Sequence, residues 1–391
     1  MTGSTRGLPR AAQAAATLVC VALLTAACGG SSSAKSSGSS DSAAAGVTHA
    51  RQQLNHYANA SSTFTPPGPQ LQAASLLKGK TVWFVPITFE APIFLIEAQA
   101  LRTALEPLGA KLQVCDGKGN PTTTSGCITQ AISNGAAGII TDAIAVPFAQ
   151  QAYAAAVDQK IPVVANDNVL QPPATSNFAR YFTGISDGIE LNGQLIADMV
   201  IADSSGKADV LFVNDTTTPL TQAAGKALLN EFATYCPGCK LSTVEIQDTA
   251  LQKVPTQVQT ALITAPSAHY VVTQFDAPSG QLVVQGASQG RPGIQFVASG
   301  GQLAGLQRVQ GGTQLADPGV DPVSGAWAAV DGLLRILAGK PAGKYDDAVL
   351  HRVFTQSNIG KTDLTQAGWS SGSWYSTGAF QSGYLKLWGV S

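Results

Sequence analysis

Short apolar runs alternate with segments of helical periodicity along most of the chain after Lys80. Residues 81–87 form a continuous run of mostly apolar and β-branched side chains, which predicts a buried strand. The apolar residues of 93–108 recur at intervals of three and four and predict a helix that ends at Gly109. Strands that alternate with helices in this way are typical of a parallel α/β sheet.

The alternation runs through two successive regions, which predicts two similar lobes. The first region has expected strands at 81–87, 111–115, 137–141 and 161–165, with helices at 93–108, 125–133 and 147–159. A connecting run at 181–184 follows. The second region has expected strands at 208–213, 241–246, 270–274 and 295–298, with helices at 188–202, 220–235, 254–265 and 278–289. A late helix is expected at 323–338, and the tail from Gly368 is rich in Trp, Tyr, Ser and Gly.

The first 27 residues have the parts of an export signal. Arg6 and Arg10 supply positive charge, residues 11–24 are apolar, and small residues precede Cys28. The apolar run of about 14 residues is shorter than the roughly 20 that a membrane-spanning helix needs. The segment resembles the lipobox of bacterial lipoproteins, in which the cysteine is acylated and becomes the first mature residue. We therefore expect a lipid on Cys28, with secretion and a free Cys28 as the alternative.

Two polar segments separate this signal from the first strand. Residues 28–46 are rich in Ser and Gly and are expected to form a flexible tether. Residues 47–78 form an N-terminal extension with one expected helix at 47–57 and a proline-rich linker at 66–69. The predicted location is therefore the outer face of the cell membrane, held by the lipid alone.

Composition narrows the class of protein. Of the 391 residues, 45% are hydrophobic and 12% are charged, and the formal net charge is −1. This balance excludes a chain that is disordered throughout and gives no electrostatic basis for nucleic-acid binding. After the first 30 residues, no apolar run is long enough to cross a bilayer.

Four cysteines remain once Cys20 leaves with the signal and Cys28 carries lipid. Their even number in an exported chain suggests disulfides, and sequence proximity favours Cys115–Cys127 and Cys236–Cys239. The second pair also fits a redox CxxC pattern, but its place between a helix and a strand favours a structural link. A four-cysteine zinc site lacks the paired CxxC spacing, so we expect no metal site and no cofactor.

Several stretches resemble type I periplasmic binding proteins of ABC importers, in particular the ribose/galactose-binding branch. The loop at 88–94 is similar to the family's aromatic sugar-contacting loop, and 161–168 is similar to its "IPVV…D" strand end, with Asn168 where an Arg follows in the family. The other similar stretches are the hinge crossing at 181–187, the strand end at 270–276 and the returning segment at 310–339. The resemblance covers about residues 79–341.

This resemblance implies an α/β fold of two doubly wound, Rossmann-like lobes joined by a multi-strand hinge. Lobe I would comprise 79–183 and 318–341, and lobe II 184–317 and 342–391. The implied function is extracytoplasmic capture of a small polar solute, a sugar or sugar-like compound, by hinge closure. The implied partners are an ABC permease and its ATPase, the protein being a monomer and not an enzyme.

Ligands of such folds bind outside the carboxyl ends of the strands, so residues that follow the strands face the cleft. Carboxylates and amides pair with hydroxyl groups, and aromatic faces cover the C–H side of a sugar ring. Asp167 and Asp276 also fit capping roles, and Phe89 and Phe94 also fit the core. The candidate ligand-binding residues are Phe89, Glu90, Phe94, Asp142, Asp167, Asn168, Thr217, Thr218, Gln222, Phe275, Asp276, Gln302 and Asp317.

Two other functions compete with solute delivery. A sensor that reports its ligand to a membrane receptor would use the same two lobes, and the sequence does not separate it from an importer component. A secreted α/β hydrolase would need a nucleophile motif and a histidine in the crevice. The sequence has no G-x-S-x-G, H-E-x-x-H or P-loop motif, and none of its four histidines follows an expected strand.

Overall fold

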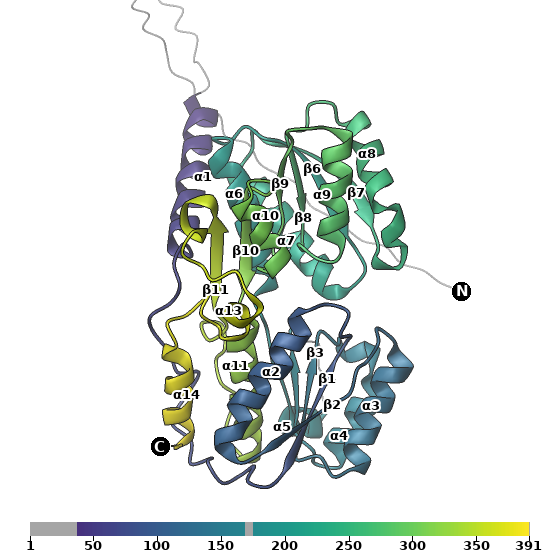
Figure 1. The fold of residues 1–391 in the computed structure, drawn as a ribbon, viewed down its shortest axis with the longest axis vertical. Coiled ribbons are helices and arrows are strands. Elements are labelled where there is room, and N and C mark those ends of the chain that lie inside the picture. The colour runs from purple at the N-terminus through teal and green to yellow at the C-terminus, as the bar shows by residue number, and fades with distance from the viewer. Residues whose placement is uncertain (1–36, 169–174, 391) are drawn as a thin grey trace, which may run out of the picture. The chain divides into compact units, whose positions relative to one another are not determined.

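Parallel strands and the helices between them account for most of the chain after Lys80, as the periodicity predicts. The computed structural model describes residues 37–168 and 175–390, so the expected signal, Cys28 and residues 28–36 of the expected tether lie outside the described residues. Residues 37–46 of that tether are helical, so the expectation of a flexible segment is wrong for this part. Two sheets are present, one of five strands and one of six. The expected α/β class with two sheet-centred lobes is confirmed (Figure 1).

The first sheet is wholly parallel and has the order β2-β1-β3-β4-β5. Its strands are β1 (Thr81–Pro86), β2 (Lys111–Val114), β3 (Gly138–Asp142), β4 (Val163–Asn166) and β5 (Phe182–Ile185). The helices between them are α2 (Ile93–Leu105), α3 (Pro121–Ser133), α4 (Gln150–Asp158) and α5 (Ser176–Tyr181), with short turns η1 (Glu106–Leu108) and η2 (Val146–Phe148). Strand β5 lies in the run expected to be a connection, and it forms because Val163 to Asn166 pair with it in parallel register.

The second sheet has the order β11-β10-β9-β8-β6-β7, parallel except for the antiparallel β10–β11 pair. Its strands are β6 (Asp209–Asp215), β7 (Lys240–Ile246), β8 (Tyr270–Thr273), β9 (Gln295–Val297), β10 (Ala316–Val320) and β11 (His351–Thr355). Its helices are α6 (Ile189–Asp203), α7 (Pro219–Tyr235), η3 (Asp248–Lys253), α8 (Val254–Thr264), α9 (Ser279–Gly290), α10 (Leu303–Gln310) and α12 (Gln356–Ile359).

Helix α11 (Pro322–Leu337) carries the chain from the second sheet back to the first. Asp321 caps it by accepting hydrogen bonds from the backbone N–H groups of Val323 and Ser324, each at 3.1 Å. The helix is buried over most of its length and packs on β4, β5 and α2 of the first sheet. Between β1 and β11, the chain therefore passes between the two sheets three times, after β5, before α11 and after α11.

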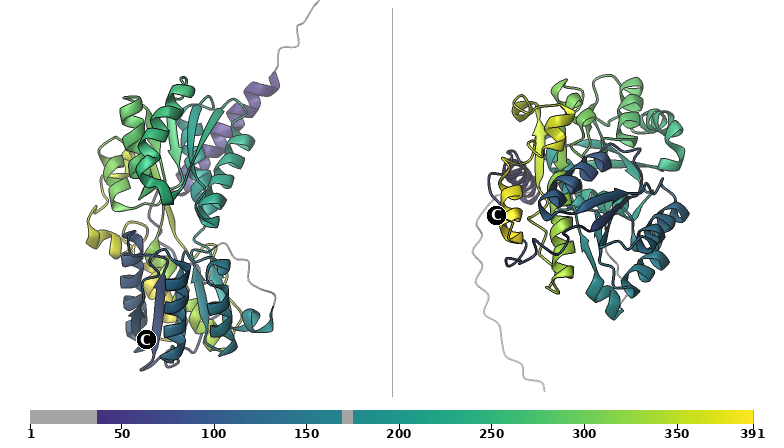
Figure 2. Two further views of the ribbon diagram at one scale, coloured as in Figure 1. Left: turned by 90° about the vertical axis from the view of Figure 1, so that its right-hand side faces the viewer. Right: turned by 60° about the horizontal axis from the view of Figure 1, so that its bottom comes forward.

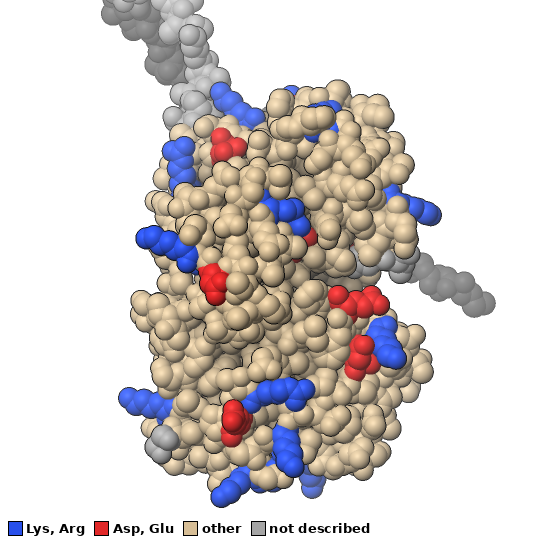
Figure 3. Space-filling view, in the orientation of Figure 1, with Lys and Arg blue, Asp and Glu red and all other residues tan. Residues whose placement is uncertain are grey.

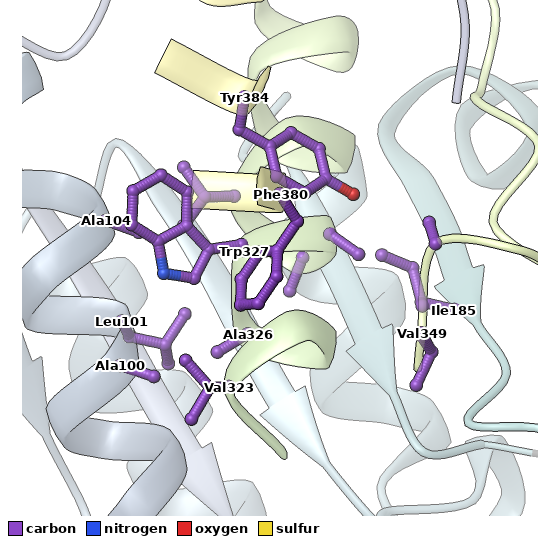
Figure 4. Close-up of a cluster of buried hydrophobic side chains, with 14 of the residues drawn as sticks. Ala100, Leu101, Ala104, Ile185, Val323, Ala326, Trp327, Val349, Phe380 and Tyr384 are labelled. Atoms are coloured by element: carbon purple, nitrogen blue, oxygen red, sulfur yellow. The ribbon is translucent and has the colours of Figure 1, made fainter. Parts of the chain in front are cut away.

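The C-terminal residues divide between the two sheets. Strand β11 extends the second sheet, whereas α14 (Ala379–Trp388) packs on α11, where the Trp327 and Trp388 rings stack with centroids 5.4 Å apart. Phe380, Tyr384 and Trp388 recur every four residues and lie on the buried face of α14. Figure 4 shows Phe380 and Tyr384 beside Trp327 of α11. The structure therefore differs from the expected placement of 342–391 in lobe II, because this aromatic face is buried against the helix that covers sheet one. The short helix α13 (Gln366–Ser370) lies beside α2.

Helix α1 (Ser37–His56) begins earlier than the expected helix at 47–57 and packs beside the second sheet (Figure 2). Ala50 is fully buried in a cluster with Ile196 and Phe232. A Cβ atom on Gly46 would lie 1.8 Å from the backbone oxygen of Tyr235, so α1 approaches α7 closely only because residue 46 is glycine. None of the helices in the described ranges combines the length and apolar character that crossing a bilayer requires.

Both expected cysteine pairs lie at bonding distance. The Sγ atoms of Cys115 and Cys127 are 1.99 Å apart, and those of Cys236 and Cys239 are 2.00 Å apart. The first pair joins the end of β2 to α3, and the second lies in the turn between α7 and β7.

Candidate functional site

A group of buried polar side chains lies where strands β3 and β4 end. Asp142 ends β3 with 1% of its surface exposed, and its Oδ2 accepts a hydrogen bond from Asn166 Nδ2 at 2.8 Å. Asp167 follows β4 with φ of 47°, a left-handed conformation that aspartate tolerates better than most residues. Asn168 is buried and donates from Nδ2 to the Ile144 backbone oxygen at 2.6 Å. The structure therefore brings three of the predicted residues, Asp142, Asp167 and Asn168, to one edge of the first sheet.

Helix α2 adds a carboxyl group that the sequence analysis did not select. Glu97 is 1% exposed, and a carboxylate oxygen of Glu97, Asp142 and Asp167 each lie within 4.8 Å of one another. In the sequence, Glu97 lies three or four residues from Ile93, Ala100 and Leu101, so it is a charged residue on the apolar face of the predicted helix. A charged residue on a buried helix face is the signal that could have identified it.

Burial changes the protonation of this acidic group. Burial, followed by the nearby charges of Asp142 and Asp167, raises the pKa of Glu97 well above its ordinary value. Burial raises the pKa of Asp142 to about 6, and hydrogen bonds to its carboxylate from Glu97 and Asn166 oppose this rise. Burial also raises the pKa of Asp187, at the crossing after β5, to about 7. These causes favour the protonated form of Glu97 beside Asp142.

Some oxygens of these carboxyl groups form no hydrogen bond with the described residues. Glu97 Oε2 and Asp142 Oδ1 have no hydrogen-bond partner among the described residues. Within the same ranges, no ion pair joins Glu97, Asp142 or Asp167 to a Lys or Arg. Unpartnered buried acceptors favour a bound group that brings hydrogen-bond donors, such as a hydroxyl or an ammonium.

The ends of β6 and β8 in the second sheet are joined by a glutamine that the sequence analysis missed. Gln274 is fully buried, and its Nε2 donates to Asn214 Oδ1 at 2.6 Å while its Oε1 accepts from the Asp215 N–H at 3.0 Å. Thr218 caps α7 by accepting from the Thr221 N–H at 3.1 Å. Gln222 is exposed and donates to the Thr216 backbone oxygen at 3.0 Å.

Asp276 and Asp317 form a second buried acidic pair, beside the loop that follows β9. Both are fully buried, and each accepts a backbone hydrogen bond at 2.9 Å, Asp276 from the N–H of Gln302 and Asp317 from that of Gly301. Burial and the neighbouring charge raise the pKa of Asp317 well above its ordinary value, and burial raises that of Asp276. A Cβ at Gly305 would lie within 2.2 Å of both carboxylates, so glycine is required there. Each aspartate therefore holds the loop through one oxygen, while Asp276 Oδ1 and Asp317 Oδ2 have no hydrogen-bond partner among the described residues.

The remaining predicted residues are less enclosed. Phe89 is half-buried, with its ring centroid 6.4 Å from that of Phe84 in an edge contact. Phe94 is 8% exposed, Phe275 is half-buried and Glu90 is exposed. Thr217 is half-buried, and its hydroxyl donates to Asp215 Oδ1. Phe89 and Phe275 therefore keep ring surface that a ligand can cover.

Charges on the face shown in Figure 3 are scattered among uncharged side chains, with no broad area of one sign. Two cavities are lined by residues away from the strand ends. One, of about 160 Å³, lies among α1, α6 and α7, and the other, of about 610 Å³, is lined by the proline-rich segment at 65–71 and residues after α11.

Comparisons with known proteins agree with this architecture. Solved structures with a similar fold include the 5-methylthioribose transporter solute binding protein from Thermotoga lettingae (17% identity, TM-score 0.65, covering 82% of this chain and 100% of that one). They also include the Caulobacter myo-inositol binding protein bound to myo-inositol (16% identity, TM-score 0.63, 73% and 97%). A third is a Mycobacterium smegmatis protein in complex with β-D-fucofuranose (17% identity, TM-score 0.61, 76% and 98%).

These identities are low, so the structural likeness shows a shared fold. No curated protein matches the sequence. A family model described as the periplasmic binding protein domain matches residues 82–341, which is most of the region that holds both sheets. On this match and this fold, the chain belongs to the periplasmic binding protein domain family.

Proposed function

We propose that this protein captures a small polyhydroxylated solute, a sugar or polyol, and delivers it to an ABC importer. Its family is a class of solute-binding, non-enzymatic proteins that work outside the cytoplasm. Proteins of similar fold were solved with 5-methylthioribose, myo-inositol and β-D-fucofuranose bound, or are named as sugar transporter subunits. The observation that carries the proposal is the set of unpartnered buried acceptors at the ends of β3 and β4.

The ligand would bind between two lobes that follow the expected boundaries, 79–183 with 318–341 and 184–317 with 342–391, except that α14 belongs with α11. Lobe I would contribute Asp142, Asp167 and Asn168, with the Glu97 carboxyl beside Asp142. Lobe II would contribute Phe275 and residues near Thr218 and Gln302. A solute that contacts both lobes stabilises the closed state, because only that state makes both sets of contacts. The permease would then recognise the closed form.

The acidic group at lobe I narrows the solute class. Three carboxyl groups without a Lys or Arg partner favour a ligand rich in donors, so polyols and amino sugars fit better than acidic sugars. An acidic sugar would bring a further negative charge to a group that already shares protons.

Export and anchoring complete the proposal. The protein would leave the cytoplasm by its N-terminal signal, carry lipid on Cys28 and act as a monomer at the outer face of the membrane. The two cysteine pairs at bonding distance would form as disulfides in that oxidising location.

A thermal-shift screen over pentoses, hexoses, polyols, amino sugars and uronic acids would test this function. A solute at about 100 times its Kd adds about 2.7 kcal/mol to stability, which raises Tm by several degrees. Small-angle scattering of the protein with that solute should then show a smaller radius of gyration. A bound solute that leaves the radius unchanged would contradict closure, and turnover of the solute would contradict the non-enzymatic role.

A further inference from the structure

Three helices enclose a small cavity of about 160 Å³ that lies apart from the strand ends. Each helix turns two polar or aromatic side chains, four residues apart, toward this space, since residues at that spacing share a helix face, and Leu191 of α6 adds an apolar wall. The pairs are His49 and Gln53 on α1, Gln194 and Asp198 on α6, and Glu231 and Tyr235 on α7. One histidine and two carboxylates therefore converge from three separate segments of the chain.

Asp198 is the unexplained member of this group. It is 1% exposed, and neither of its carboxylate oxygens has a hydrogen-bond partner among the described residues. Glu231 lies beside it, and its only ion pair within the described ranges is with His49, whose Nε2 is 2.9 Å from Glu231 Oε1. A buried carboxylate next to a second carboxylate is unfavourable unless a cation or a proton compensates for it.

The geometry suits a metal ion. One ligand atom from each of His49, Asp198 and Glu231 lies within 4.8 Å of the others. Ligands about 2.0–2.1 Å from a tetrahedral zinc ion stand roughly 3.3 Å apart, so small side-chain rotations would complete the site. The His49 ring stacks on Tyr235 with centroids 3.7 Å apart and planes 4° from parallel, which fixes the plane of the imidazole. The His49 side chain remains 25% exposed, which leaves a path for an ion to enter.

The ligand set indicates which ions fit. A neutral imidazole with two carboxylates suits zinc and neighbouring transition metals, whereas calcium and magnesium favour oxygen ligands alone. We propose that His49, Asp198 and Glu231 bind a divalent transition-metal ion of the zinc type, which fastens the N-terminal helix α1 to α6 and α7. Water or the amide oxygen of Gln53 or Gln194 would complete the coordination.

Zinc binding to the purified, untagged protein tests this site. After dialysis against a chelator, isothermal titration with zinc chloride at pH 7.5 should give one bound ion per chain and a Tm raised by a few degrees. Cobalt(II) should give the visible absorption of a four-coordinate site. Asp198→Asn, which keeps the shape of the side chain, should weaken zinc binding at least tenfold without lowering the Tm of the metal-free protein. His49→Ala should weaken it equally.

His56→Ala is the matched control, because His56 is exposed on the same helix and does not line the cavity. It should leave zinc affinity unchanged. Absence of stoichiometric zinc binding, equal affinity of Asp198→Asn and wild type, or preferential binding of calcium or magnesium would each overturn the proposal. Solute binding at the strand ends is measured separately, so its failure would be distinguishable from failure of the metal site.

Discussion

A buried carboxylate needs a proton, a cation or several donors, and at the ends of β3 and β4 the protein supplies these only in part. Asp142 accepts a hydrogen bond from Asn166, and hydrogen bonds with the Glu97 carboxyl and the Ala143 backbone also oppose the rise in its pKa. A buried polar atom without a hydrogen-bond partner costs about 1–3 kcal/mol. A ligand that donates a hydrogen bond to such an atom would remove this cost.

Substitutions of Asp167 test whether the ends of β3 and β4 bind the solute. Replacing it by glycine removes the side chain without adding strain, because φ of 47° suits glycine. We expect Asp167→Gly to weaken solute binding at least about tenfold in calorimetry with little change in Tm. Asp167→Ala should lose the same affinity but also about 1 kcal/mol of stability through the left-handed backbone. Exposed Glu106 offers the control Glu106→Gln, and unchanged affinity in Asp167→Gly would remove Asp167 from the site.

The raised pKa of Glu97 should make the stability of the folded protein depend on pH. Its pKa is raised in the folded protein, so the folded state keeps a proton that the unfolded state releases above about pH 4.3. Stability from this group is therefore complete at low pH and is lost as pH rises toward the folded pKa. Glu97→Gln keeps a donor to Asp142 without a titrating proton.

We expect the Tm of Glu97→Gln relative to wild type to rise between pH 5 and pH 8. A gain of about 2–4 °C at pH 8 would correspond to about 1 kcal/mol. Scanning calorimetry at several pH values measures it, and parallel pH profiles for the two proteins would contradict the assignment.

At the scale of elements, the packing of α14 on α11 is an aromatic contact between distant parts of the sequence. Trp388 is fully buried, stacks on Trp327 and donates from Nε1 to Asp331 Oδ1 at 2.9 Å. Trp388→Ala should lower the free energy of unfolding by about 3–5 kcal/mol in urea titrations. Leu95→Ala, at a half-exposed position on α2, should change it little. A small effect at Trp388 would mean that α14 contributes little to the core.

The two cysteine pairs should differ in their contribution to stability. They close loops with sequence separations of 12 and 3, and the longer loop restricts the unfolded chain more. Replacing Cys115 and Cys127 by serine should cost about 3 kcal/mol, against about 2 kcal/mol for Cys236 and Cys239. Thermal melts of both double variants under oxidising conditions compare them, and melts of wild type under reducing conditions serve as the control.

For the molecule as a whole, the proposed attachment to the membrane depends on residues outside the described ranges. If Cys28 carries the lipid, Cys28→Ala should move the protein from the membrane fraction and prevent incorporation of labelled palmitate. Cys20→Ala is the control, because Cys20 leaves with the signal. A Cys28→Ala protein that stays membrane-bound would contradict lipid anchoring.

The prediction of the fold succeeded where local periodicity carries the information. Buried strands such as β1 and β8 read as apolar runs, and helices such as α8 read as a stripe, because each pattern depends only on nearby residues. Strand β5 could not be distinguished from a connection, because its identity depends on pairing with β4. In the candidate site, Asp142 and Asp167 could be selected from the sequence, because ligands of such folds bind at the carboxyl ends of strands.

Patterns along the chain were therefore enough to predict the α/β class, the succession of two lobes and the strand-end position of the acidic residues. The approach of Glu97 to Asp142, the packing of α14 on α11 and the meeting of His49 with Asp198 and Glu231 became visible only in the folded chain. The difference lies in the range of the interactions. Periodicity records what each segment buries, whereas a shared proton, a ring stack or a cation site depends on which distant segments the fold brings within a few ångströms.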